Sequence, residues 1–287
     1  MPELPEVETI ARGLRADLCG ARVAAGALLW PGVLESGHGA LDGAAFPEAV
    51  AGGRIDAVWR RGKVLLLDLG GPGRAPLHLA FHLRMTGRLT VEPGDAGPTR
   101  HTRLLLDLAD GRRLFFADAR KFGRCRAMSP KALGRWPFFA ALGPEPLELD
   151  ARAFAALLAG RRARIKALLL DQSVLAGVGN IYADESLFRA GIHPADTAAA
   201  LGPARLERLH GALVRVLAEA IAANGSSISD YVNAHGDAGA FQNDFRVYGR
   251  RGCPCRVCSA PLVRTAVAGR TTTFCPHCQP PARAGGA

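Results

Sequence analysis

Two cysteine pairs near the end of the chain constrain its folding more than any other feature. Cys255 and Cys258 form the first pair, Cys275 and Cys278 form the second, and sixteen residues separate the pairs. Four thiolates at this spacing can surround one tetrahedral zinc ion, with each pair on a tight turn. Because four cysteines fill the coordination sphere, we expect one structural Zn²⁺ rather than a catalytic one.

Neighbouring residues leave alternatives to this ligand set open. Cys253 lies just before the first pair and His277 lies inside the second, so either could replace a ligand. Unligated core cysteines are a further alternative. Residues 261–267 and 270–274 have the composition of two β strands joined by a tight turn. The sequence therefore predicts a zinc-finger β-hairpin at this end.

The charge distribution indicates a polyanionic partner. The chain has a formal net charge of +10, and residues 245–287 contain seven arginines and no acidic residue. A chain this basic is expected to meet nucleic acid, an acidic membrane face or an acidic protein. A solvated basic tail would also give this charge, but the cysteine pairs in the same stretch favour a folded basic module.

Several classes of protein are disfavoured by the sequence. No run of about 18 apolar residues exists, so we expect no membrane span. The first ten residues contain three glutamates and no lysine or arginine, which argues against a secretory signal. Seven cysteines, four of them in tight pairs, are typical of metal binding in a reducing compartment. We therefore expect a cytoplasmic protein.

The rest of the chain divides into a β-rich part and a helical part. A short helix is expected over residues 6–18, and runs of β-forming residues follow, at 63–69, 77–83, 89–91, 103–108 and 113–116. Many short strands with Gly and Pro between them suggest a sandwich or barrel. Beyond the Pro-containing stretch 136–146, apolar residues recur every three or four positions from Leu206 to Ile221, which predicts a long helix.

These patterns predict an α+β multidomain chain. Its parts are an N-terminal β-sandwich domain with a leading helix over residues 1–132, a linker over 133–149, a helical domain over 150–244, the zinc finger over 245–281 and a tail over 282–287.

Three separated motifs resemble those of the formamidopyrimidine-DNA glycosylase family. Residues 1–9, MPELPEVET, resemble its signature start, and residues 170–186 resemble its helix–two-turn–helix element. Residues 247–250, followed by the cysteine pairs, are similar to its C-terminal zinc finger. The resemblance covers residues 2 to about 279. It implies a monomeric, bacterial DNA-repair enzyme that meets the nucleoid, removes oxidised purines from damaged double-stranded DNA and then cuts the strand.

The chemistry of the N-terminus supports this activity independently. Methionine before proline is typically removed, which would leave Pro2 with a free secondary amine. An α-amino group has a reference pKa of about 8, so a useful fraction is neutral near pH 7, unlike a lysine at about 10.4. Attack on C1′ of a deoxyribose would displace the base and leave a Schiff base, from which β,δ-elimination can follow. Taken alone, Pro2 and Glu3 favour an ordinary helix start.

The resemblance implies further catalytic and lesion-binding roles. Glu3 is expected to shuttle a proton during ring opening and base departure, and Lys63 to stabilise the departing phosphate. Arg270, near the tip of the hairpin, is expected to act on phosphate and is grouped with the catalytic residues. Glu6 is expected to hold the damaged base, with a solvated helix-face carboxylate as the alternative.

A flipped base leaves a hole in the duplex that something must fill. Met85 aligns with the void-filling methionine of the family, Arg120 with the arginine that pairs with the orphaned base, and Phe122 with its wedging aromatic. Without the resemblance, Met85 and Phe122 would be assigned to a core.

The resemblance also implies DNA contacts from His101, Lys166 and Asn180. Asn180 is expected to contact a backbone phosphate, with Gly177 and Gly179 permitting close approach. Lys166 is expected near the phosphate backbone or the damaged base.

Two rival functions stay open. An endonuclease VIII-like relative would share the nucleophile but prefer oxidised pyrimidines. The void-filling residues, and the resemblance of residues 226–240 to a lesion-capping loop in the helical domain, favour purines. A non-catalytic zinc-dependent DNA-binding protein would have no need for Pro2, Glu3 and Lys63.

Overall fold

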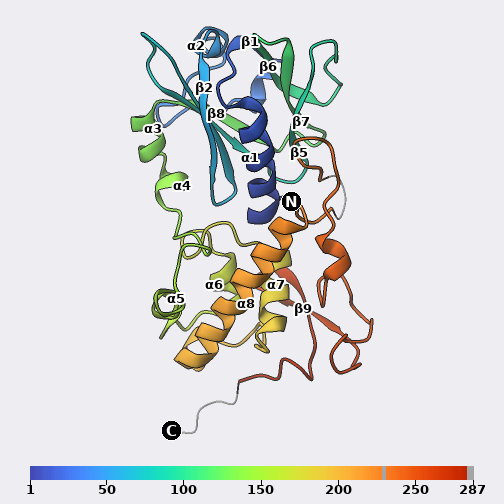
Figure 1. Ribbon diagram of the computed structural model, residues 1–287. Helices are drawn as coiled ribbons and strands as arrows, with labels where there is room; N and C mark the ends of the chain where they lie inside the picture. The colour runs from blue at the N-terminus through green and yellow to red at the C-terminus, as the bar shows by residue number, and fades with distance from the viewer. Residues whose placement is uncertain (228–230, 283–287) are drawn as a thin grey trace. The chain divides into compact units, whose positions relative to one another are not determined.

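The computed structural model describes residues 1–227 and 231–282 (Figure 1). The centre of the expected lesion-capping loop, residues 228–230, and most of the expected tail, residues 283–287, lie outside the described residues. The chain forms two compact units, one of residues 1–141 with 223–240 and one of residues 142–222 with 241–287.

The first unit is a β-sandwich behind a leading helix, as the sequence predicted. One antiparallel sheet has the strand order β1-β6-β7-β5 and the other has the order β2-β3-β4-β8. Phe81 and Phe116, one from each sheet, meet edge to face with ring centroids 5.3 Å apart, so the two sheets share one core. The elements of this unit are α1 (Leu4–Leu18), β1 (Val23–Leu28), α2 (Phe46–Val50), β2 (Arg54–Arg61), β3 (Val64–Gly70), β4 (Leu77–His82), β5 (Gly87–Pro93), β6 (Thr102–Leu108), β7 (Arg112–Asp118), β8 (Arg124–Met128), α3 (Pro130–Arg135) and α4 (Pro137–Ala140).

Helix α1 packs on this sandwich through one apolar stripe. Its buried apolar residues recur at helical spacing and join the sandwich core: Val7, Ile10, Leu14 and Leu18. Pro5 suits the first turn, because its missing N–H would have no partner there. The helix ends before Gly20, whose φ of +91° a glycine adopts without strain.

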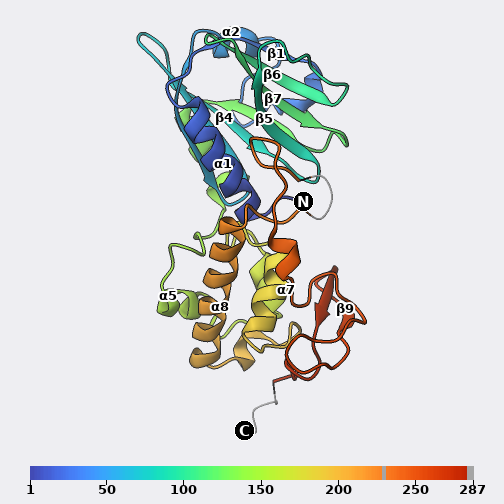
Figure 2. The same cartoon turned by 45° about the vertical axis from the view of Figure 1, so that its right-hand side comes forward.

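The second unit is helical and carries the predicted hairpin. Its elements are α5 (Ala151–Leu158), α6 (Ile165–Leu170), α7 (Asn180–Arg189), α8 (Pro203–Ala222), β9 (Val263–Val267) and β10 (Arg270–Phe274). Helix α8 packs on α5 and α7 through its predicted leucine stripe. Strand β10 contacts α7, and Figure 2 shows the hairpin alongside that helix.

The loop after α8 belongs to a different unit from the one that the sequence predicted. Residues 223–240 belong to the first unit, whereas the sequence placed them with the helical domain. The loop lies against α1: a Cβ on Gly13 would approach the Ala234 Cβ to 2.9 Å, so only glycine permits this contact. The periodicity of the sequence ends with α8, but it carries no signal for the surface on which the next loop packs.

Among the described residues, no helix has both the length and the apolar character that crossing a membrane requires.

Candidate active site and zinc centre

Helix α1 and strand β2 lie side by side and run in opposite directions. Three hydrogen bonds fix this direction: Gly20 N–H to Ile55 O at 2.8 Å, Arg15 Nε–H to Val58 O at 2.8 Å, and Arg60 Nε–H to Glu8 Oε2 at 2.8 Å. Twelve helical residues rise about 18 Å, and five strand residues span about 17 Å. The two elements therefore cover nearly the same distance between their first and last hydrogen bonds.

The same register brings the start of α1 to the turn between β2 and β3. Pro2 and Glu3 directly precede α1, six residues before Glu8, and Lys63 follows strand β2, three residues after Arg60. Lys63 lies in that turn and is almost completely buried. Residues from two distant segments of the sequence, Pro2 and Lys63, are thus brought to one end of the sandwich.

The N-terminal residues themselves are held tightly. Pro2 and Glu3 are buried, whereas 46% of Met1 is exposed. The Glu3 N–H donates to Glu6 Oε2 at 2.8 Å, as in the capping box of a helix start.

Glu6 links the start of α1 to the loop of residues 223–240. Its Oε1 accepts a hydrogen bond from the Ser226 N–H at 2.8 Å, and a Cβ on Gly225 would lie 3.0 Å from the same oxygen. The Tyr231 hydroxyl donates to the Glu6 carbonyl at 3.4 Å, and burial together with the Glu6 charge raises the pKa of Tyr231. Because Glu6 is buried, the alternative of a solvated helix-face carboxylate is wrong.

His82 is a site residue that the sequence analysis missed. In the antiparallel pair of β3 and β4 it lies opposite Val64, next to Lys63. Burial, followed by the positive charges of Arg84 and Lys63, lowers the pKa of His82 to about 3. Its Nδ1 accepts a hydrogen bond from the Arg84 N–H at 3.2 Å, which leaves the proton of the neutral ring on Nε2.

The lowered pKa of His82 predicts a pH-dependent stability. Below about pH 6.5 the unfolded chain binds a proton at this histidine and the folded chain does not, so acid favours unfolding. We expect His82→Gln to reduce the loss of unfolding free energy between pH 7.5 and 4.5 by about 2–3 kcal/mol. Urea unfolding at both pH values measures this difference. Equal pH dependence in the two proteins would contradict a neutral, buried His82.

Met85 and Phe122 are exposed on neighbouring loops of the first unit. Their exposed fractions are 42% and 48%, so neither is the core residue that composition alone would suggest. The Arg120 guanidinium lies 4.7 Å from the centre of the Phe122 ring, a cation–π contact that pairs the two side chains. Exposed apolar side chains beside a cation suit stacking against nucleic-acid bases.

Asp118 organises these two loops. Its buried carboxylate accepts hydrogen bonds from the Thr86 hydroxyl, from the Arg120 N–H at 3.1 Å and from the Gly123 N–H at 2.6 Å. The Asp118 N–H in turn donates to the His101 carbonyl at 2.9 Å, which places His101 at the same end of the sheet.

Backbone strain marks the same two loops. Arg84 and Lys121 have φ values of +54° and +58°, which non-glycine residues seldom adopt. Each residue adjoins an exposed apolar side chain, Met85 or Phe122. The strained backbone therefore supports the display of these side chains on the surface.

In the second unit, the structure corrects the expected direct DNA contact of Lys166. The side chain is completely buried, and its ammonium pairs with Asp184 at 2.7 Å. It also donates to the Thr271 carbonyl at 3.0 Å and to the Thr272 hydroxyl at 2.7 Å. Burial raises the pKa of Asp184 to about 6 despite the nearby ammonium. Lys166 thus holds the hairpin on the helices and does not face solvent.

Asn180 supports the hairpin at the same point. Its Nδ2 donates to the Thr271 carbonyl at 2.9 Å, so that carbonyl receives two donors. Arg270, the residue before Thr271, is exposed. It comes directly after a turn in which Ala268 and Gly269 both have positive φ. The two hydrogen bonds to the Thr271 carbonyl hold strand β10, which carries Arg270, in place.

Glu185 attaches the start of the zinc module to α7. Its buried carboxylate accepts hydrogen bonds from three consecutive backbone N–H groups, those of Arg246, Val247 and Tyr248, at 2.8–3.1 Å. A carboxylate that accepts hydrogen bonds from three consecutive N–H groups stabilises this turn strongly. Glu185 is therefore a structural residue.

The four predicted cysteines form the zinc site. Their sulfur atoms all lie within 4.8 Å of one another, and two of the pairs are 3.5 Å and 3.9 Å apart: Cys258–Cys275 and Cys255–Cys278. Ligands about 2.3 Å from a tetrahedral zinc are about 3.8 Å apart, so the geometry fits this metal. Within the described residues, Cys253 and His277 lie outside the cluster, and both alternative ligands are excluded.

Family models match most of the chain in three consecutive segments. Residues 1–125 match the formamidopyrimidine-DNA glycosylase N-terminal domain, residues 142–232 match its H2TH domain, and residues 252–281 match a zinc finger found in FPG and IleRS. A formamidopyrimidine-DNA glycosylase of Nitratidesulfovibrio vulgaris is 47% identical, with 97% of this chain and all of the relative covered.

The chain belongs to the formamidopyrimidine-DNA glycosylase family.

Solved structures of this family agree with the assignment. A Lactococcus lactis Fpg in complex with DNA that contains an oxidised pyrimidine has a TM-score of 0.85 and 34% identity. A MutM in complex with DNA that contains carbocyclic 8-oxo-G has a TM-score of 0.85 and 35% identity. In both comparisons 97% of this chain and all of the other chain are covered. The glycosylase family therefore accounts for the sandwich, the helical unit and the zinc finger together.

Proposed function

We propose that this glycosylase-family chain excises oxidised purines from double-stranded DNA and then cleaves the strand by β,δ-elimination. The observation that supports the proposal is the antiparallel register of α1 against β2, in which the start of α1, beside Pro2, and the turn after β2, which contains Lys63, lie at the same end of the two elements. A secondary amine, a carboxyl group at Glu3 and a buried cation then share one end of the sandwich. The exposed residues Met85 and Phe122 belong to the same unit.

The first chemical step uses Pro2 after removal of Met1. The neutral nitrogen attacks C1′, the bond from C1′ to the base breaks, and the base departs with the bonding electrons and takes up a proton. Glu3 is the proton shuttle for ring opening and base departure. The Pro2 nitrogen then loses its proton, the C1′–O4′ bond breaks and O4′ takes up a proton, which leaves an iminium. The iminium withdraws electrons from C2′, so a C2′ proton is lost and the 3′ phosphate leaves.

Cations assist the two eliminations. Lys63 stabilises the charge that develops on the departing phosphate, and its burial strengthens that interaction because water is excluded. His82, neutral beside it, adds no competing charge and keeps a hydrogen-bond donor on Nε2. Arg270, exposed at the hairpin, binds phosphate in the second elimination.

Lesion binding requires a base to leave the stack, which costs a few kcal/mol. Met85 and Phe122 insert into the duplex, and Arg120 pairs with the orphaned base. Glu6 and the loop of residues 223–240, which are hydrogen-bonded to each other, contact the extruded base. Asn180 and His101 bind the DNA backbone, and Lys166 acts indirectly by holding the hairpin.

Matched duplexes test the substrate class. We expect 8-oxoguanine opposite cytosine to be excised at least about tenfold faster, in kcat/KM, than an oxidised pyrimidine opposite guanine. Faster excision of the pyrimidine would favour the endonuclease VIII-like alternative. Met85→Ala should slow 8-oxoguanine release by about tenfold, because the void left by flipping is no longer filled. A preformed abasic duplex is the control, since its cleavage needs no base to be flipped.

We propose further that the enzyme acts as a monomer on damaged DNA, in the cytoplasm at the nucleoid. A monomer needs no second copy because all the proposed catalytic residues lie on one chain.

A further inference from the structure

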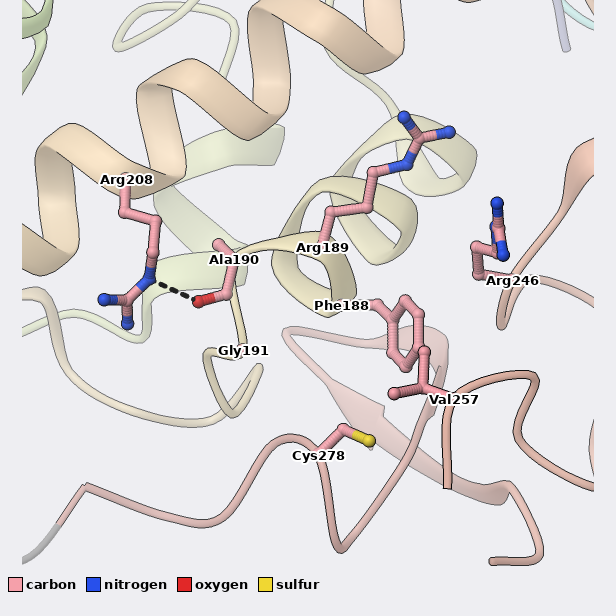
Figure 3. Close-up of a pocket in the computed structure, with 8 residues that line it drawn as sticks. All are labelled: Phe188, Arg189, Ala190, Gly191, Arg208, Arg246, Val257 and Cys278. Atoms are coloured by element: carbon pink, nitrogen blue, oxygen red, sulfur yellow. Dashed lines mark hydrogen bonds between the residues drawn. The ribbon is translucent and has the colours of Figure 1, made fainter. Parts of the chain in front are cut away.

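A cavity of about 550 Å³ in the second unit is not used by the proposed reaction. It lies where α7 ends, and its walls come from α7, α8 and the zinc module. Figure 3 shows three of its lining arginines, Arg189, Arg208 and Arg246, together with the apolar lining residues Phe188 and Val257. This volume lies in the range of sites that take small molecules or peptide side chains.

The cavity lies apart from the residues assigned to DNA. Helix α7 begins at Asn180, whose side chain supports the hairpin beside Arg270, and ends at Arg189 on the cavity wall. Nine helical steps separate Asn180 from Arg189, about 14 Å. A ligand in the cavity would therefore leave the Asn180 end of the helix accessible.

The rim of the cavity carries unbalanced positive charge. Arg189 pairs with Glu219 at 2.6 Å, but no ion pair of Arg208 or Arg246 is formed within the described residues. The Arg208 Nε–H donates to the Ala190 carbonyl at 2.9 Å. This hydrogen bond orients the side chain and leaves its two terminal nitrogens available to donate to a ligand. The nearby carboxylate of Glu185 is already held by three backbone N–H groups.

The floor of the cavity is apolar. Val257 is 70% exposed, although it lies on the rigid turn between two zinc ligands, Cys255 and Cys258. Phe188, near the end of α7, is the other large apolar side chain that lines the cavity. An apolar contact area with arginines at its edge matches the apolar centre and polar rim of protein-binding surfaces. A DNA backbone would match the charge but would supply no side chain for the apolar floor.

We propose that this cavity is the docking site for an acidic peptide segment of a partner protein. One apolar side chain of the segment packs against Phe188 and Val257, and neighbouring carboxylates pair with Arg208 and Arg246. Arginine forks and buried apolar anchors are the groups that dominate such interfaces.

Fluorescence anisotropy with a labelled six-residue peptide of four aspartates followed by leucine and phenylalanine tests the proposal on the zinc-loaded full chain. We expect saturable binding that Arg246→Glu and Val257→Ser each weaken by at least about tenfold. Arg162→Glu is the matched control, because Arg162 is an exposed arginine of the same unit outside the cavity. Strand cleavage of a lesion duplex should be unchanged in all three variants.

Three results would overturn the proposal. One is the absence of binding to the wild-type chain. Another is equal weakening by Arg162→Glu, which would indicate attraction by net charge alone. The third is weaker binding of an undamaged DNA duplex in Arg246→Glu with peptide binding unchanged, which would make the cavity a nucleic-acid surface. The Val257→Ser variant keeps the test valid if a charge reversal disturbs folding, because Val257 is largely exposed.

Discussion

A protein with an uncleaved tag ahead of Pro2 is expected to cut abasic and 8-oxoguanine duplexes at least about 10³-fold more slowly than the same protein after the tag is removed to expose Pro2. In the tagged chain the proline nitrogen is an amide whose lone pair is delocalised, so it cannot attack a sugar carbon. Single-turnover strand cleavage before and after proteolysis measures the effect on one preparation.

Controls separate the nucleophile from steric blocking. The same tag placed at the C-terminus should leave cleavage unchanged. Pro2→Gly keeps an α-amine but makes it primary. Cleavage should therefore fall, while borohydride should still capture some covalent complex between the protein and the sugar. Full activity of the N-terminally tagged protein, or wild-type activity of Pro2→Gly, would rule out the proposed role of Pro2.

Loss of the zinc ion is expected to abolish tight DNA binding while the sandwich stays folded. The core around the zinc site is small, with five buried members: Phe188, Val247, Cys255, Leu262 and Cys275. Zinc contributes about 10–16 kcal/mol to the folding of comparable fingers, more than such a core can supply. Unfolding the finger would release the strand that carries Arg270, and DNA affinity should fall more than about tenfold.

Cys275→Ser tests this prediction with a matched control. The variant should lose its zinc equivalent and show a weaker salt dependence of DNA binding, because phosphate contacts are lost. Cys253→Ser should keep both properties, since Cys253 lies outside the sulfur cluster. A Cys275→Ser protein with bound zinc and unchanged affinity would show that the finger does not depend on this ligand set.

The features that the sequence predicted well are those with a local pattern. The zinc ligands were found because the turn geometry of a Cys-x2-Cys pair is fixed by neighbouring residues. Short runs of β-forming residues with Gly and Pro between them predicted the sandwich or barrel, and helix α8 followed from hydrophobic periodicity, which depends on residues a few positions apart. The family assignment drew on motifs that are contiguous in the sequence.

The features that the sequence missed depend on contacts between distant segments. Nothing in the sequence around Lys166 indicates that its side chain is buried. The fold buries it against Asp184 and the hairpin. Asp118 organises two loops because strand pairing brings Thr86 beside it. His82 became a site residue because β3 and β4 pair in a register that places it next to Lys63. No local pattern encodes these pairings.

The proposed mechanism requires that one particular nitrogen of the protein bonds to the damaged sugar. Borohydride reduction during the reaction with an 8-oxoguanine duplex converts a Schiff base into a stable amine, and peptide mass spectrometry then locates the sugar remnant. We predict that the remnant lies on the nitrogen of an N-terminal Pro2 from which Met1 has been removed. A remnant on Lys63 or any other lysine would contradict the account.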